Sequence, residues 1–373
     1  MTLICKNLGS RIRELVICPI YANLPSEMQA KIFEPTPEGA RKVVLATNIA
    51  ETSITIDGIV YVIDPGFIKQ KNYNPATGME SLIIVPASRA SANQRKGRAG
   101  RVGPGKCFRL YTAWAYQNEL EENTTPDILR SNMANTVLLL KSLGINDLVN
   151  FDFLDAPPVQ TLQRSLEQLY ALGALNDRGE LTKLGRKMAE FPVDPMLSKT
   201  IIIAEKYGCT EEVVSIVAML SAGGAIFYRP KEKVVHADQA RKNFFRPGGD
   251  HLSLLQVWNS WVETNYSIQW CHENFIQHRA MKRVRDIRDQ LIGLMERTEV
   301  QLVSNPDPAD TVPIRKAFTS GYFYNTATLQ RQGDTYRTIK SNQTVCIHPS
   351  SCLHGEDKPR WILYFELVFT TRE

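Results

Sequence analysis

Apolar residues follow two different patterns along the chain, and the change between them lies near Asp127. In the first part, short β-branched runs closed by Pro, Gly or Asn predict strands at 14–20, 42–46, 59–64 and 82–86. Between the first two runs, residues 26–33 carry an apolar stripe, and Ser26 precedes Gln29 with the spacing of a capping box. Strand, helix and strand joined by short links predict a parallel sheet.

Two further segments predict β-hairpins. In the first, strand-forming residues at 67–73 and 80–85 flank the turn sequence Asn74-Pro-Ala-Thr-Gly78. In the second, residues 174–182, short apolar stretches flank Asp177-Arg-Gly179. The second hairpin follows helices predicted at 132–143 and 160–172, and helices followed by a small hairpin are typical of a winged-helix domain.

The remainder predicts a helical block and then a β domain. Helical spacing of apolar residues predicts helices at 196–203, 211–221, 251–264 and 274–296. In the last of these the expected buried stripe is Ile276, Ala280, Val284, Ile287, Leu291 and Leu294. Residues 306–313 have linker composition. Alternation of apolar and polar positions beyond them predicts a small β-barrel that includes Tyr322, Tyr324, Tyr336, Val345, Ile347, Trp361, Leu363, Phe365 and Leu367.

Composition places the chain among multidomain globular proteins. Its 373 residues correspond to two or three domains, and 43% hydrophobic with 22% charged residues excludes a disordered or fibrous chain. No apolar run approaches the ~18 residues that span a bilayer, and the first residues do not resemble a secretory leader. The odd count of 7 cysteines, with no Cys-x-x-Cys pair, indicates free thiols. We therefore expect a soluble intracellular protein.

Positive charge is concentrated in one stretch, although the net charge is only +5. No acidic residue lies between Glu80 and Glu119, and seven cations do: Arg89, Arg95, Lys96, Arg98, Arg101, Lys106 and Arg109. A solvated basic face would normally interleave acids, so this stretch favours binding of phosphate, either of a nucleotide or of a nucleic acid.

The centre of this stretch is Gln94-Arg-Lys-Gly-Arg-Ala-Gly-Arg101. Its small residues let the backbone approach a ligand, and Arg98 and Arg101 would share a face if a helical turn starts there. Two guanidinium groups suit a γ-phosphate in a phosphoryl-transfer reaction, and a glutamine can orient the attacking water.

This string, together with Thr47-Asn-Ile-Ala-Glu-Thr-Ser-Ile-Thr-Ile-Asp57, resembles motifs VI and V of DEAH-box superfamily 2 ATP-dependent RNA helicases. The similarity continues at residues 20–25, 101–111, 169–175 and 347–351 and so covers essentially the whole chain. Phe227-Tyr-Arg-Pro-Lys231 and Arg246-Pro-Gly-Gly-Asp-His251 make the chain most similar to the pre-mRNA-splicing members.

The resemblance implies a multidomain α/β, α and β fold with four domains. They are a second RecA-like helicase domain at 1–126, a winged-helix domain at 127–195, a helical ratchet-like domain at 196–305 and an oligonucleotide-binding OB-fold domain at 306–373. The OB-fold domain is expected to be incomplete at Glu373, and the chain to be only the C-terminal half of its family's proteins.

The resemblance also implies roles for individual residues. For nucleotide hydrolysis these are the water-positioning Gln94, the arginine fingers Arg98 and Arg101, the γ-phosphate sensor Ser53, the ribose contact Asp57 and the adenine-stacking Phe33. For RNA binding they are Ala22, Asn23, Thr47, Asn48, Lys71 in the 67–85 hairpin, His348 and Ser350. The implied cofactors are ATP and Mg²⁺.

Half of the expected catalytic site is absent from the sequence. It contains no Gly-x-x-x-x-Gly-Lys-Ser/Thr phosphate loop and no Asp-Glu-Ala-His box, and Pro104-Gly-Lys-Cys107 lacks the magnesium-binding hydroxyl. In the family these elements belong to a first RecA-like domain, which we expect before residue 1 and which would hold most of the Mg²⁺ ligands. The chain alone is therefore expected neither to hydrolyse ATP nor to unwind RNA.

The resemblance implies an RNA helicase of pre-mRNA splicing, located in the nucleus. Its expected partners are single-stranded RNA or pre-mRNA, spliceosomal proteins and a glycine-patch activator protein; we expect a monomer and no membrane contact. One alternative is that the isolated chain is a non-catalytic docking and RNA-binding module for that activator. A weaker alternative is a DNA-directed helicase of the same superfamily.

Other groups have simpler explanations. Cys346, His348, Cys352 and His354 suggest zinc, but their spacing is not that of a zinc finger, so no metal site is predicted. The cations at 279–288 form either a solvated face or an RNA or protein contact. Three tryptophans and two histidines are expected to be structural, namely Trp258, Trp261, Trp270, His236 and His251.

Overall fold

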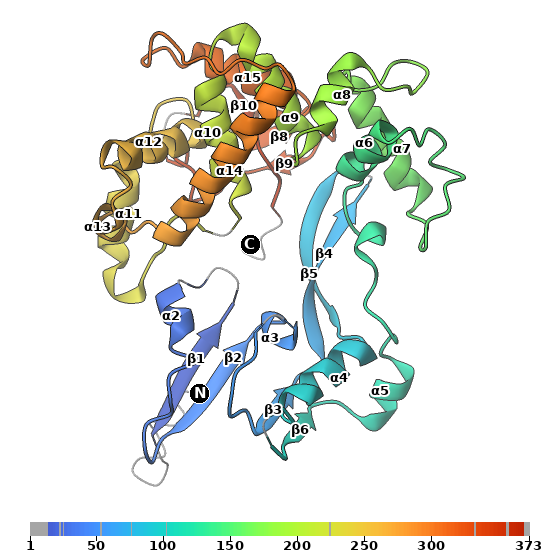
Figure 1. Cartoon of the computed structure of the whole chain (residues 1–373), viewed down its shortest axis with the longest axis vertical. Helices are drawn as coiled ribbons and strands as arrows, with labels where there is room; N and C mark the ends of the chain where they lie inside the picture. The colour runs from blue at the N-terminus through green and yellow to red at the C-terminus, as the bar shows by residue number, and fades with distance from the viewer. Residues whose placement is uncertain are drawn as a thin grey trace. The chain divides into compact units, whose positions relative to one another are not determined.

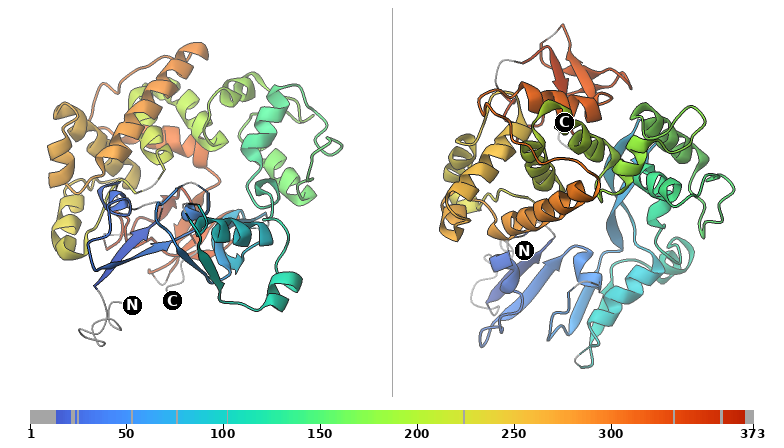
Figure 2. Two further views of the ribbon diagram at one scale, coloured as in Figure 1. Left: turned by 60° about the horizontal axis from the view of Figure 1, so that its bottom comes forward. Right: turned by 45° about the horizontal axis from the view of Figure 1, so that its top comes forward.

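The computed structural model describes residues 14–21, 24, 26–52, 54–75, 77–101, 103–223, 225–331, 333–355 and 358–368. The chain divides into two compact units, one of Met1–Asn72 with Leu82–Pro126 and one of Tyr73–Ser81 with Asp127–Glu373. The first contains short parallel strands with helices beside them, and the second is mainly helical (Figures 1 and 2). Among the described residues, no helix is long and apolar enough to cross a membrane.

The first unit contains parallel strands, of which the one at Lys106–Arg109 was not predicted. Strand β1 (Leu15–Ile20) pairs with β2 (Arg41–Ala46), and β3 (Tyr61–Asp64) pairs with β6 (Lys106–Arg109), both in parallel. The accompanying helices are α2 (Ser26–Ala30), α3 (Ile49–Thr52), α4 (Arg89–Arg98) and α5 (Ala113–Asn118). Helix α4 packs against α3, β3 and β6. The segment that follows β2 is thereby brought next to the end of the arginine-rich helix.

The predicted hairpin at 67–85 is confirmed. Strands β4 (Phe67–Asn74) and β5 (Met79–Pro86) pair with each other, and the Gly78 N–H donates to the Asn74 carbonyl at 2.8 Å across the turn. In the second unit the hairpin tip is held by Tyr73, which is 8% exposed and whose N–H donates to the Arg130 carbonyl at 3.0 Å. The turn is therefore anchored rather than free.

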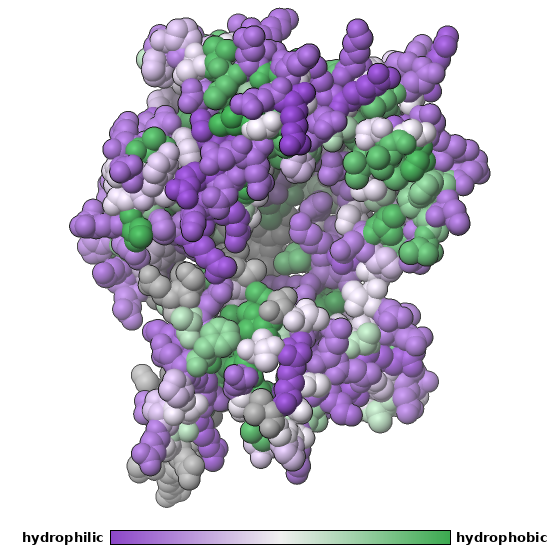
Figure 3. Space-filling view, viewed as in Figure 1, coloured by the Kyte–Doolittle hydropathy of each residue, from purple (hydrophilic) through white to green (hydrophobic). Residues whose placement is uncertain are grey.

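The winged-helix pattern is also confirmed, and it is followed by one helix that was not predicted. After the 3-10 turn η2 (Asp127–Leu129) come α6 (Ala134–Ser142) and α7 (Val159–Ala171). Leu175 and Leu181 then form an antiparallel bridge, and Thr182 begins α8 (Lys183–Ala189) by accepting from the Gly185 N–H. On the outer face, apolar side chains gather over α6 and α7 (Figure 3).

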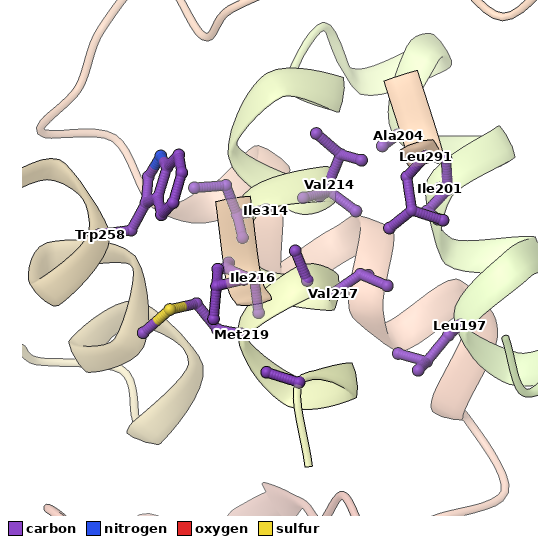
Figure 4. Packing of buried hydrophobic residues seen from close by; sticks show 14 of the residues in the cluster. Leu197, Ile201, Ala204, Val214, Ile216, Val217, Met219, Trp258, Leu291 and Ile314 are labelled. Atoms are coloured by element: carbon purple, nitrogen blue, oxygen red, sulfur yellow. The ribbon is translucent and has the colours of Figure 1, made fainter. Parts of the chain in front are cut away.

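The helical block encloses the main core of the second unit. Its helices are α9 (Pro195–Ala204), η3 (Glu205–Tyr207), α10 (Thr210–Ser221), η4 (Lys231–Lys233), α11 (Val234–Lys242), α12 (Asp250–Glu263), α13 (Ile268–Glu273) and α14 (His278–Arg297). Figure 4 shows side chains of α9, α10, α12 and α14 meeting in this core, with α10 contributing most. The predicted burial of Trp258 and Trp261 is confirmed, and Trp270 packs against the same core.

The predicted helix at 274–296 begins too early. Helix α14 starts at His278, because Phe275 has a positive φ of 55° and Ile276 forms an antiparallel bridge with Phe227. The predicted stripe is otherwise correct, since Ala280, Val284 and Leu291 are buried. Apolar spacing alone did not distinguish a bridged residue from a helical one.

The start of the C-terminal part was predicted wrongly. Residues Val312–Tyr322 form helix α15, so Tyr322 lies on a helix rather than a strand, and it is buried against α9. The strands are β7 (Thr326–Leu329), β8 (Tyr336–Thr338), β9 (Thr344–Val345) and β10 (Trp361–Leu363), in the order β10-β7-β8-β9 with antiparallel pairing. Closure of this sheet into a barrel stays a prediction.

His251 gives the second unit a pH-dependent stability. Its ring stacks on Phe318 with centroids 4.5 Å apart and meets the edge of Phe365 at 6.0 Å. Burial lowers the pKa of His251 from 6.5 to about 4, although part of the residue stays exposed. Between about pH 4 and pH 6.5 the imidazole is therefore neutral in the folded protein and protonated in the unfolded chain.

We predict that the free energy of unfolding falls as the pH falls from 6.5 toward 4, because the unfolded chain binds this proton first. The loss is about 1–3 kcal/mol after allowing for partial exposure. His251→Phe keeps the ring packing and should flatten the profile in denaturant titrations, whereas His236→Gln, at an exposed position, should not. Parallel profiles for all three proteins would contradict this assignment.

Candidate functional site

The segment that follows β2 presents polar side chains at the carboxyl end of a parallel strand pair. The Thr47 N–H donates to the Ile20 carbonyl at 3.2 Å, and the Thr47 carbonyl accepts from the Ala50 N–H at 3.3 Å as α3 begins. The Thr47 and Asn48 side chains remain exposed. Carboxyl ends of parallel strands are where α/β sheets commonly bind ligands.

Arg95 joins three elements of the first unit through charged hydrogen bonds. From α4 its Nε donates to Glu51 Oε1 at 2.7 Å, and its Nη1 donates to Asp64 Oδ1 at 2.6 Å. The Asp64 side chain is fully buried, and the side chains of Arg95 and Glu51 are only 13% and 10% exposed. A guanidinium that bridges two nearly dry carboxylates fixes geometry more strongly than surface ion pairs do.

The remaining hydrogen-bonding capacity of both carboxylates is also used. Asp64 accepts from the Tyr111 hydroxyl at 2.9 Å and from the Gly66 N–H at 3.0 Å, and Glu51 Oε2 accepts from the Ser91 hydroxyl at 3.0 Å. Burial, followed by the bond to Asp64, raises the pKa of Tyr111. The strand end of β3, helix α3 and helix α4 are thus fastened together by one polar network.

The arginines at the end of α4 reach back to the segment after β2. Arg98 donates to the Glu51 carbonyl and, at 3.3 Å, to the Ile54 carbonyl. Arg101 Nη1 donates to the Thr55 hydroxyl at 2.5 Å. Partial burial and then the charge of Arg101 lower the pKa of Arg98. An anion between the two cations would counter this lowering.

The helical geometry of this segment differs from the prediction. Helix α4 ends at Arg98 with Ala99 as its C-cap, so Arg101 lies beyond the helix and the two arginines do not share a helical face. Gln94 and Arg98 do share one, since they are four residues apart on α4, and Gln94 is exposed. The basic residues sit at the helix C-terminus, where the helix dipole favours them.

Gly105 allows the strand after this turn to pass close to the helix end. A Cβ at this position would lie 1.8 Å from the Ala99 carbonyl oxygen and 2.6 Å from the Val60 carbonyl oxygen. Only glycine fits there without moving the backbone. Gly105 thus has a packing role that its sequence pattern alone did not reveal.

The other predicted nucleotide and RNA residues of the first unit lie on its surface. Phe33, just beyond α2, is 58% exposed, and Asp57 and Lys71 are also exposed. Ser53, Ala22 and Asn23 lie outside the described residues. The structure therefore brings Arg98 and Arg101 together with the 51–55 segment, and it does not test the roles of the remaining residues.

In the second unit, His348 and Ser350 belong to a loop that is held in place from both sides. His348 Nδ1 and Ser350 Oγ are 2.7 Å apart, and the Ser350 carbonyl accepts from Arg241 of α11 at 2.7 Å. The Cys352 N–H donates to Asp250 Oδ1 of α12 at 2.8 Å. Exposed polar side chains are thereby presented on a fixed backbone.

Sequence comparison finds matches to four families in successive parts of the chain. Residues 2–103 match the helicase conserved C-terminal domain, and residues 165–193 match the winged-helix helicase associated domain (HA2). Residues 194–254 match the ratchet-like HA2 domain, and residues 314–373 match the oligonucleotide/oligosaccharide-binding OB-fold. Together they indicate the C-terminal region of a DEAH/RHA-type helicase.

The helicase C-terminal, winged-helix, ratchet-like and OB-fold domains are thus present in the expected order. The boundaries at 126, 195 and 305 stay predictions. Helicase and OB-fold domains suggest nucleic-acid binding, which agrees with the exposed polar side chains described above. The match at 2–103 contains both arginine-rich α4 and the segment after β2.

Other candidate chemistry in this helicase region is mostly structural. Among the residues that the structure describes, no three His, Cys, Asp or Glu side chains cluster as a metal site would require. In the 279–288 basic run, Arg283 donates to the Ala222 carbonyl at 2.8 Å and Arg288 donates to the Ser215 hydroxyl at 2.8 Å. These two cations hold α14 against α10, which favours a structural role for that part of the run.

Sequence reasoning missed Arg95, Glu51 and Asp64 as a unit. Arg95 was considered only for its positive charge, and Glu51 was given no role of its own within its motif. The sequence contains one indication of this ion pair: Glu51 lies between Ala50 and Thr52, close to an apolar strand. A carboxylate in such surroundings needs a cationic partner. Sequence offers no means of choosing that partner among seven cations.

We predict that Arg95→Met lowers the free energy of unfolding of the first unit by about 3 kcal/mol, because Asp64 would stay buried without its cation. Hydrogen exchange of the β3 and α4 amides measures the change. Lys96→Ala, which removes an exposed cation from the same helix turn, is the control and should change little. Adding Asp64→Asn to Arg95→Met should restore part of the loss, and no restoration would contradict the proposed coupling.

Proposed function

We propose that this chain supplies the second half of the ATPase site and the RNA-binding surfaces of an ATP-dependent RNA helicase. The observation that carries the proposal is that Arg98, at the end of α4, and Arg101, just beyond it, both donate hydrogen bonds to residues between Glu51 and Thr55. Two guanidinium groups oriented in this way suit the charge that develops on a transferred phosphoryl group.

The residues present fit one side of an ATP molecule. Arg98 and Arg101 would hold the γ-phosphate, exposed Gln94 would orient the attacking water, and exposed Phe33 and Asp57 would contact base and ribose, with Ser53 as a phosphate sensor. Bound ATP supplies the phosphoanhydride bond whose hydrolysis releases the free energy for movement. The family resemblance implies that a first RecA-like domain would hold most of the Mg²⁺ coordination.

RNA would be held through its backbone. Exposed Thr47 and Asn48 at the strand end, Lys71 on the hairpin, and His348 and Ser350 on the fixed loop offer hydroxyl, amide and cationic donors, with Ala22 and Asn23 expected to add to them. Contacts of this kind go to phosphate and ribose and so give binding that depends little on base sequence.

The biological setting follows from the resemblance to splicing helicases at 227–231 and 246–251. We propose that the protein remodels RNA–protein complexes in pre-mRNA splicing, acts in the nucleus as a monomer and contacts spliceosomal proteins. A DNA-directed helicase is the alternative, and comparison of RNA with DNA as the stimulating polymer distinguishes the two.

A second role is favoured by the exposed apolar side chains of the winged helix. Leu139, Leu143, Val149 and Tyr170 are between 51% and 69% exposed, on or near α6 and α7 (Figure 3). Exposed apolar patches commonly mark protein contacts. With no phosphate loop in the sequence, the isolated chain would serve as a docking and RNA-binding module for a glycine-patch activator protein.

The chain by itself should show no ATP hydrolysis above background in a steady-state assay, with or without single-stranded RNA. The physical reason is that the sequence lacks the phosphate loop that grips the α- and β-phosphates. Turnover typical of helicases from this chain alone would refute the division of the site.

When the chain is joined to a domain that carries a phosphate loop and a DEAH box, RNA-stimulated ATPase should appear. Arg98→Ala and Arg101→Ala should each lower the rate by roughly 10³-fold or more while nucleotide binding is retained, as expected for groups that act in the transition state. Lys96→Ala is the matched control. Unchanged rates for both arginine variants would contradict the proposed site.

A further inference from the structure

Helices α9 and α15 of the second unit lie side by side, and their contact leaves a basic pocket on the surface. They approach closely because Gly321 has no side chain: a Cβ there would lie 2.1 Å from Thr200 Oγ1 and 2.4 Å from the Met196 carbonyl oxygen. Beside this contact is a cavity of about 560 Å³, open to solvent. It lies apart in sequence from every residue assigned above to ATP or RNA.

The pocket has a strong excess of positive charge. Lys199 of α9, Lys206 of η3 and Lys316 of α15 all line it, and none of the eight lining residues is acidic. Glu205, which adjoins Lys206 in sequence, does not line the pocket, and its carboxylate accepts from the Gln301 N–H at 2.9 Å. Burial lowers the pKa of Lys199. An anion in the pocket would favour the charged form of that amine.

The other lining groups suit a phosphodiester backbone with attached bases. Tyr207 brings a hydroxyl group that can donate to a phosphate oxygen, whereas the Thr319 and Ser320 hydroxyls donate to the Arg315 and Lys316 carbonyls within α15 at 2.7 and 3.0 Å. Phe323 is 37% exposed at the edge of the pocket, and the Lys199 ammonium lies 5.2 Å from its ring centroid. Lysines next to an exposed aromatic ring are the combination that single-stranded nucleic-acid sites use, because the ring stacks a base while the cations hold phosphate.

The lining residues follow one face of each helix. Lys316 and Ser320 of α15 and Phe323, the residue that follows it, are spaced as i, i+4 and i+7. Lys199, Ile203 and Lys206 have the same spacing on α9 and η3. Seven residues of helix extend over about 10 Å. The pocket is therefore long enough for more than a single phosphate group.

We propose that this pocket binds the sugar–phosphate backbone of single-stranded RNA, as a site additional to the contacts at Thr47, Asn48 and the 348–350 loop. The proposal rests on the proposed action on RNA. It gives the ratchet-like and OB-fold domains a shared contact with the strand, since α9 and α15 come from the two matched regions 194–254 and 314–373.

The test is equilibrium binding of a fluorescein-labelled single-stranded oligouridylate to the full chain without nucleotide, at several salt concentrations. The triple variant Lys199→Ala, Lys206→Ala, Lys316→Ala should bind at least about tenfold more weakly. The slope of log affinity against log salt should become shallower by about 2, since each lost phosphate contact removes about 0.7. Phe323→Leu should weaken binding roughly fivefold through lost stacking.

The matched control removes the same net charge elsewhere in the second unit. Arg178, Lys183 and Arg186 are exposed on and before α8, and their triple alanine variant should bind RNA like the unchanged chain. Arginine at all three pocket positions should retain binding. Thermal unfolding of each variant verifies that the fold is intact.

Three results would each overturn the proposed RNA site. They are an equal loss of affinity in both triple alanine variants, no loss of affinity in the pocket variant, and no RNA binding by the unchanged chain. The proposed function has a separate readout, because the effect of Arg98→Ala on RNA-stimulated hydrolysis does not depend on these lysines. If the pocket variants lose RNA affinity as expected but Arg98→Ala leaves hydrolysis unchanged, only the ATPase proposal is contradicted.

Discussion

The ion pairs of Arg95 with Glu51 and Asp64 are the constraint on which the candidate ATPase site depends. Two carboxylates in nearly dry surroundings need a cation with fixed geometry, and a guanidinium can reach both at once. Satisfying them fastens α3 and the end of β3 to α4. The Glu51 and Ile54 carbonyls are then in place to orient Arg98. A buried network thus helps to position Arg98, one of the two candidate phosphate contacts.

In the second unit, exposed polar side chains are supported by a packed helical core. Its core is built around α10, which is buried along most of its length between α9, α12 and α14. The 348–350 loop is tied to α11 and α12, and the lysine pocket is formed by α9 and α15. Each candidate RNA contact is therefore attached to elements that this core holds. Rigid support of this kind reduces the entropy lost when a flexible strand binds.

Periodicity predicted most elements correctly and failed where tertiary contacts overrode local preference. Apolar spacing and turn sequences predicted β1, β2, β3, both hairpins and the helices α6, α7, α9, α10, α12 and most of α14. They missed β6, α8, α11 and α13. The errors at 274–277 and at Tyr322 have specific causes. Ile276 is buried because it forms a β-bridge with Phe227, not because it lies on a helix. Tyr322 is buried because helix α15 packs against α9, not because it lies on a strand. Over so short a stretch, the spacing of apolar residues is compatible with both a helix and a strand.

The sequence by itself determined the family, the order of domains and the two cations most suited to a phosphoryl group, because motif strings and charge runs are local in the chain. It also showed that the phosphate loop is not in this chain. Only the tertiary structure decided which of seven nearby cations is buried, that Arg101 lies beyond the end of α4, and that three lysines from residues 199–316 share one pocket. Burial and proximity between residues far apart in sequence are properties of packing, and no spacing along the chain encodes them.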